Sequence, residues 1–170
     1  AVSTAGDITT SADNITFARA VTLTGNVALN TASGAGNITF TSTTDGGYNL
    51  TLTAGSGNVT LPGAVGGSTR LNALTIASAT NVTASGAITA ASIAQTAGSD
   101  TTTFNGALNT NTASGIDLNG TAFTLNAAVT TSSGGTLTIT NSGTLTIAAA
   151  ADMTLAGAFT QDGGAQPASF

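Results

Sequence analysis

The sequence has no cysteine, histidine or tryptophan, and it contains neither lysine nor glutamate. Without cysteine, disulfides, thiol catalysis and thiolate metal sites are excluded. Without histidine or lysine, no conventional base can activate the many serine and threonine hydroxyls as nucleophiles. The only cations are Arg19 and Arg70, and seven aspartates bring the net charge to −5. Two isolated arginines cannot form the basic patch that holds a phosphate backbone, so we expect no nucleic-acid partner.

Long hydrophobic runs are also missing. The longest run of apolar residues, 147–151, is far shorter than the ~20 residues of a membrane-spanning helix, so we expect no membrane insertion. The first residues, AVSTAGDITT, show neither the basic nor the apolar region of a signal peptide. Charged residues are 5% of the chain and prolines number two, which is unlike a disordered segment. We therefore expect residues 1–170 to form one folded segment, which could itself belong to a longer repeat array.

Threonine, alanine and glycine dominate what is present, and a unit of apolar residue, threonine and apolar residue recurs along the chain. Alternation with a period of two places both apolar side chains on one face and the threonine on the other, which predicts half-buried strands. Full copies lie at 15–17, 21–23, 38–40, 50–52, 59–61, 74–76, 123–125, 137–139, 145–147 and 153–155. Looser copies lie at 27–29, 82–84, 88–90 and 116–118.

Turn-forming segments separate these units, among them GN, DGG, SGAGN and GSGN. Strands that are short, numerous and evenly spaced indicate a sandwich, a barrel or a solenoid. Aromatic residues are only 4% of the chain and the units are nearly interchangeable, which favours the solenoid. We therefore predict an all-β fold, a parallel β-helix of about seven or eight coils with three short strands each. The gap between Val59 and Leu74 predicts a longer loop or an unrecognised strand.

The stretches GDITTSADNITFARAVTLTGNV and GGTLTITNSGTLTIAAAADMTLAGAFTQDGG resemble the shaft repeats of filamentous-haemagglutinin-like exoproteins of Gram-negative bacteria. The middle of the chain, SGAGNITFTSTTDGGYNLTLTAGSGNVTLPGAVGG, has the same texture. The resemblance implies a right-handed parallel β-helix, export across the outer membrane and a place on a large surface adhesin. It covers shaft repeats alone, because the secretion and anchoring motifs of that family are not found in the sequence.

Six Asn-x-Thr triplets match the acceptor motif for N-glycans. The same triplet also arises whenever an asparagine closes a turn and the next strand begins, and this second interpretation is favoured. Surface glycans remain a candidate partner. The triplets begin at Asn14, Asn37, Asn49, Asn58, Asn81 and Asn119.

Three other patterns have the residue types of binding or catalytic sites. Thr-x-Thr pairs, such as those at 51/53, 136/138/140 and 144/146, would suit ice only if one face carried the pair in every coil, and the pairs are scattered. The segments at 45–47 and 162–164 are Asp-Gly-Gly, but a calcium β-roll needs many such repeats, so an ordinary turn is the favoured interpretation.

Hydrolysis of a glycosidic bond needs two carboxylates a few ångströms apart. The aspartates at 7, 13, 45, 100, 117, 152 and 162 show no such pairing, and Asp117 is expected to point outward from a strand.

The sequence thus predicts a structural segment without catalytic, cofactor-binding or metal-ligating residues. We expect a shaft segment of an extracellular or cell-surface adhesin or filament, whose partners are flanking repeats or neighbouring copies stacked end to end. The end segments offer weak protection against such stacking, with Asp7 near the start and Asp162 and Pro167 near the end. The alternative is a binding module for carbohydrate or ice that uses an exposed Thr/Asn face.

Overall fold

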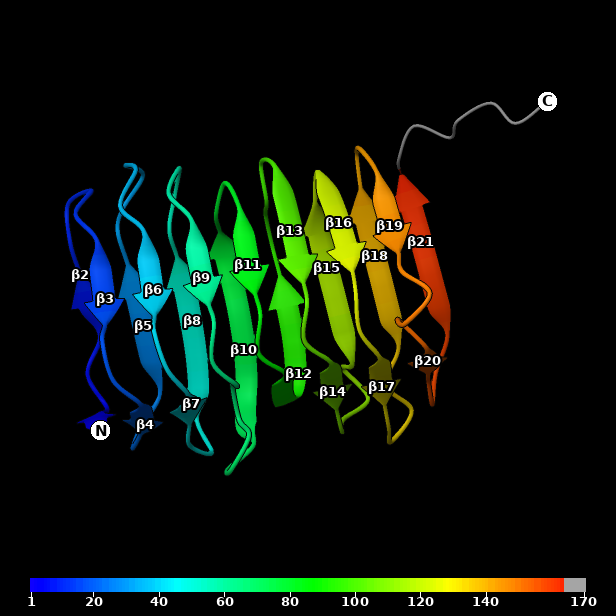
Figure 1. The fold of residues 1–170 in the computed structure, drawn as a ribbon, viewed down its shortest axis with the longest axis horizontal. Coiled ribbons are helices and arrows are strands. Elements are labelled where there is room, and N and C mark those ends of the chain that lie inside the picture. Colours follow the sequence, from blue (N-terminus) through cyan, green and yellow to red (C-terminus); the bar gives the residue numbers. More distant parts are fainter. Residues whose placement is uncertain (164–170) are drawn as a thin grey trace.

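A computed structural model describes residues 1–163, and in this part of the chain the fold is an all-β parallel solenoid of about eight coils without a helix. Successive coils stack along the long axis, so that the ribbon winds from the N-terminal end to the C-terminal end of a rod (Figure 1). Residues that pair across neighbouring coils, such as Val2 with Val21 and Thr53 with Ser78, are 19 to 25 residues apart. The predicted fold class and the predicted number of coils are confirmed.

The coils contribute strands to three faces of the rod, with the single bridge residue Val65 in place of a strand at one step of the first face, and every strand pair is parallel. The first face holds β1 (Val2–Thr4), β4 (Val21–Leu23), β7 (Thr44–Asp45), β14 (Leu108–Thr110), β17 (Val129–Thr131) and β20 (Met153–Thr154). The second face holds β2 (Ile8–Thr9), β5 (Val27–Asn30), β8 (Asn49–Thr53), β10 (Leu71–Ser78), β15 (Ile116–Gly120), β18 (Leu137–Asn141) and β21 (Phe159–Gly163). The third face holds β3 (Ile15–Phe17), β6 (Ile38–Phe40), β9 (Val59–Leu61), β11 (Val82–Ala84), β13 (Thr101–Phe104), β16 (Ala122–Leu125) and β19 (Leu145–Ile147). The long strand β12 (Ile88–Gln95) pairs with strands of both the first and the second face.

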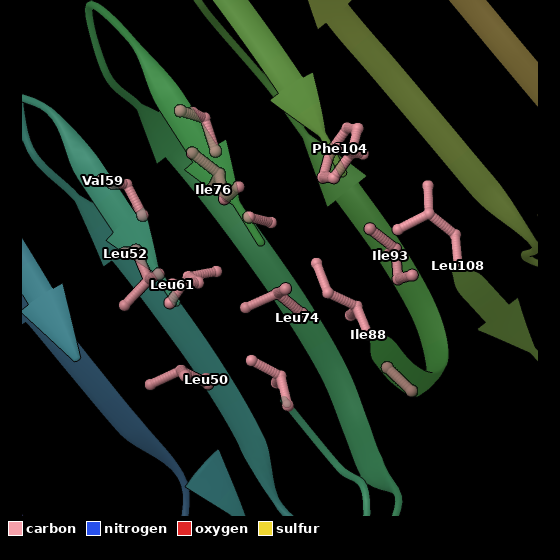
Figure 2. Close-up of a cluster of buried hydrophobic side chains, with 14 of the residues drawn as sticks. Leu50, Leu52, Val59, Leu61, Leu74, Ile76, Ile88, Ile93, Phe104 and Leu108 are labelled. Carbon is pink, nitrogen blue, oxygen red and sulfur yellow. The ribbon is translucent and has the colours of Figure 1, made fainter. Parts of the chain in front are cut away.

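The core is a set of apolar columns that run along the rod axis. On the second face one column is apolar at every step, and its members are Val27, Leu50, Leu74, Ile93, Ile116, Leu137 and Phe159. Figure 2 shows Leu50, Leu74 and Ile93 of this column among side chains from the other faces, including Leu61 and Phe104. Burial of such side chains stabilises the fold by about 1.5–3 kcal/mol each, and each coil covers the apolar groups of the next.

Several threonines within strands, and one directly after β5, point inward, contrary to the expectation that threonine faces outward. The inward members are Thr31, Thr44, Thr102, Thr110 and Thr131, and all are buried. This is why the strands at 44–45, 101–104, 108–110 and 129–131 do not match the apolar–Thr–apolar unit. Thr31 and Thr131 donate hydrogen bonds to the carbonyl oxygens of Gly36 and Gly135. The hydroxyls of Thr44 and Thr110 have no hydrogen-bond partner among the described residues.

The wide gap after Val59 contains a loop at 62–70, with one bridge residue, Val65, that continues the core column of the first face. Arg70 closes this loop. Its guanidinium donates hydrogen bonds to the carbonyl oxygens of Ala90 and Asn109, and to the Asn109 side chain, in the next two coils. One side chain therefore ties three coils together at this corner.

Candidate functional site

The aspartates are distributed along the rod, and residues 1–163 hold no group of three or more His, Cys, Asp or Glu side chains that could bind a metal ion. Some of the carboxylates accept hydrogen bonds from backbone amides of the following coil. Asp7 accepts a hydrogen bond from the Ala28 amide at 2.7 Å. Asp45 accepts from the amides of Ser68 and Thr69 at 2.7 and 3.1 Å. Asp117 is exposed in the middle of β15, as the alternation predicted.

The two Asp-Gly-Gly segments differ from each other in the structure. At the first, Asp45 ends β7 and Gly46 has a φ of 124°, a conformation that side chains rarely adopt. A Cβ at Gly46 would lie 2.4 Å from the Leu23 carbonyl oxygen of the preceding coil, so a glycine is needed there. At the second, the turn prediction is wrong for Asp162 and Gly163, because β21 extends to Gly163 and pairs with β18. Gly164 and Pro167 lie outside the described residues.

Four of the six Asn-x-Thr asparagines form a ladder along the edge where the chain enters the third face. The backbone amides of Asn37, Asn58 and Asn81 donate to the side-chain oxygens of Asn14, Asn37 and Asn58, at 2.7 to 3.0 Å. The Thr101 amide continues the series by donating to Asn81 at 3.2 Å. Each side chain thus supplies the acceptor that a turning backbone cannot supply. The asparagines therefore hold neighbouring coils together at this edge.

The other two asparagines of these triplets belong to different contacts. The backbone amide of Asn49 donates a hydrogen bond to the side-chain oxygen of Asn26, and the side-chain oxygen of Asn49 accepts one from the Asn72 side chain. Asn119 lies within β15 and its side chain donates to the Asp117 carboxylate, so it does not close a turn. The turn explanation of the triplets thus fits the four ladder members better than it fits Asn119.

Threonines on the third face stack in register, a feature that the scattered Thr-x-Thr pairs did not reveal. The central outward residue is threonine in all seven strands, and the pairing places each directly above the last. These residues, here called the threonine column, are Thr16, Thr39, Thr60, Thr83, Thr103, Thr124 and Thr146. The residues two positions away vary, so the full pair recurs in only some of the strands. We regard the threonine column as the candidate functional site.

The outward strand positions on either side of the threonine column carry no charge, and the nearest carboxylate bonded to them is that of Asp100, which accepts a hydrogen bond from the Thr101 hydroxyl. In the third face, the outward positions two residues before and after the column hold Asn, Thr, Ala, Ser or Pro, with no charged or aromatic residue. The four asparagines of the ladder described above occupy the positions two residues before the column in β3, β6, β9 and β11. The equivalent columns on the other two faces are interrupted by carboxylates, Asp45 on the first face and Asp117 on the second. The third face is therefore the one whose outward strand positions combine regular threonines with no charged residue.

Both ends of the described rod expose apolar side chains that would be core residues inside it. Val2 and Ile8 of the first coil are 37% and 36% exposed, while their column neighbours Val21 and Leu29 are 1% exposed. At the other end, Ile147 and Phe159 are 44% and 46% exposed. The backbone edges of these coils are likewise available for further strand pairing.

In residues 1–163 no helix has the length and apolarity to cross a membrane. Comparisons with family models, with curated proteins and with solved structures found no match to this chain.

Proposed function

We propose that this chain is a structural segment of an extracellular or cell-surface adhesin or filament, similar to the shafts of filamentous-haemagglutinin-like exoproteins. Its role would be to supply length, stiffness and a repetitive surface, without catalysis. The right-handed winding implied by that resemblance stays a prediction. A parallel solenoid is an extended module, because its similar coils stack along one axis. This architecture supports a structural role.

The observation that carries the proposal is the way the core columns end. The column from Val27 to Leu137 is buried at every step, yet its last member, Phe159, is nearly half exposed. A further coil stacked on β21 would bury Phe159 in the same way that β21 covers Leu137. Under the proposal such coils cover both ends, as flanking repeats of the same chain or as neighbouring copies.

Light scattering across a range of protein concentrations tests this end-to-end association. Residues 1–170 should increase in mass with concentration, and Ile8→Lys or Phe159→Lys should reduce the increase because a lysine at the end surface opposes burial. Thr75→Lys, on the side of the rod, serves as the matched control and should associate as the unchanged chain does. A monomer at all concentrations, with the amides of both end coils protected from hydrogen exchange, would contradict the proposal.

A second candidate function is binding of ice or carbohydrate through an exposed Thr/Asn face. The threonine column and the adjoining asparagine ladder favour it, because they give one face a regular, uncharged set of hydroxyl and amide groups. Binding of the folded protein to ice and to insoluble polysaccharides, compared with a variant that carries a lysine in the column, tests this candidate.

A further inference from the structure

The third face is the most regular surface of the rod. Its strand pairs keep a constant register from β3 to β19, whereas the second face has a register shift between β8 and β10 near Ile76. Neighbouring strands lie about 4.8 Å apart, so seven threonines form a line on the order of 30 Å long. The spacing is close to the shortest lattice repeat of hexagonal ice.

The side chains of this face are also held in place before any ligand arrives. Threonine is branched at Cβ and has few rotamers, so a strand fixes the direction of its methyl and hydroxyl groups. The adjoining Asn37, Asn58 and Asn81 are fixed through the ladder, each by a hydrogen bond to the next coil. A surface that is already ordered loses little conformational entropy when it binds a rigid lattice.

The chemistry of the face favours ordered water over other ligands. A threonine methyl orders the water around it, and its hydroxyl can donate to and accept from a water in the lattice. Charged groups would impose their own hydration shells, and the outward strand positions of this face hold none. The Asp100 carboxylate lies at one corner, where it accepts a hydrogen bond from the Thr101 hydroxyl. Sites for small organic ligands are usually concave and lined with aromatic side chains, and the outward positions of this face hold no aromatic residue. These features argue against carbohydrate.

We infer that the third face binds ice, with the threonine column as the contact surface. The inference rests on the second candidate function and narrows its ligand to the surface of crystalline water. The contact involves all seven strands, so affinity depends on an unbroken column. A bulky charge at its centre prevents the lattice from meeting the threonines on either side.

The test measures how much protein is incorporated into slowly growing ice, together with the freezing hysteresis of the solution. The chain and its Thr75→Lys variant, changed on the second face, should be enriched in the ice over serum albumin. Thr60→Lys and Thr83→Lys, changed at the middle of the column, should lose the enrichment and the hysteresis. Circular dichroism melting curves check that all three variants keep the fold.

The outcomes separate this inference from the functions on which it rests. Exclusion of the unchanged chain from ice, or equal loss by the control and column variants, overturns the inference. If the chain is excluded from ice but binds cellulose or chitin through the column, the second candidate function stands and the ligand named here is wrong. If it binds neither, both fail, while end-to-end association is judged separately by light scattering.

Discussion

Threonine occupies two opposite environments in this rod. At positions such as Thr60 and Thr138 it points outward, where a β-branched side chain suits a strand. At Thr44 and Thr31 it points into the core, and its hydroxyl either finds a backbone acceptor or remains unbonded. The contribution of a threonine to the free energy of unfolding is therefore neutral, stabilising or destabilising according to its position.

Thr44→Val should stabilise the protein. The Thr44 hydroxyl is buried without a hydrogen-bond partner among the described residues, and its column neighbours are Val21 and Val65. Valine has nearly the same shape, so the change removes an unsatisfied polar group and should raise the free energy of unfolding by about 1 kcal/mol. Thr31→Val is the control and should lower it by a similar amount, because Thr31 donates to Gly36. Denaturant unfolding measures both, and stabilisation by both changes would contradict this account.

Ile139→Ala and Thr138→Ala test the direction of the alternation in β18. Ile139 is fully buried, and truncation of such a side chain lowers the free energy of unfolding by about 2–5 kcal/mol. Thr138 faces outward, and its truncation should change the value by no more than about 0.5 kcal/mol. Urea denaturation of the two variants compares them directly. A larger loss for Thr138→Ala would mean that the register of the strand is misassigned.

At the scale of single elements, side chains at the corners complete hydrogen bonding between coils. Asn58 links two steps of the ladder, because its amide donates to Asn37 and its side chain accepts from the amide and side chain of Asn81. A second polar contact lies inside the rod, where Thr102 donates to Gln95 at 2.9 Å and Gln95 donates to the Asn119 carbonyl. The ladder bonds and the Gln95–Asn119 bond join segments 21 to 24 residues apart, in neighbouring coils, so they fix the register of neighbouring strands. The Thr102–Gln95 bond joins two strands of one coil.

Asn58→Ala should lower the free energy of unfolding by about 0.5–1.5 kcal/mol, because the Asn81 amide loses its acceptor. Asn58→Asp keeps an acceptor oxygen, as Asp7 and Asp45 do at other corners, and should cost less. Asn111→Ala is the control, since Asn111 is exposed and its side chain has no hydrogen bond within residues 1–163. Thermal unfolding ranks the three variants. Equal losses of stability for Asn58→Ala and Asn111→Ala would mean that the ladder does not stabilise the rod.

On the scale of the whole molecule, the rod is a one-dimensional stack in which each coil contacts its neighbours. Inner coils such as the one containing Leu74 are covered on both sides, whereas the first and last described coils are covered on one side. Stability in such an array is close to a sum of coil and interface terms. Opening should therefore begin at the ends.

Native-state hydrogen exchange should show a gradient of protection along the rod. We expect the slowest exchange for amides in β8, β10 and β12, and faster exchange in β1, β2, β20 and β21. Fusion of further coils to an end should slow exchange in the coil that they cover. Uniform protection from β1 to β21 would instead indicate that the described chain unfolds as a single unit with protected ends.

The sequence by itself determined the local structure: alternation of apolar residues and threonine specified strands, and glycine and asparagine specified the turns. From repetition of those units the parallel solenoid could be predicted, because each strand offers only a narrow apolar face that a copy of itself can cover. The inward threonines, such as Thr102, were missed because a hydroxyl at a core position gives no signal in an alternation pattern.

The tertiary structure decided which strands stack and in what register. Thr60 and Thr83 are 23 residues apart and pair in neighbouring strands. The sequence around each residue does not indicate this pairing, because it depends on the coil length that the intervening turns and loops set. The threonine column, the asparagine ladder and the uncharged third face all arise from that register. They depend on contacts between coils of unequal length, 19 to 25 residues, which a local pattern cannot determine.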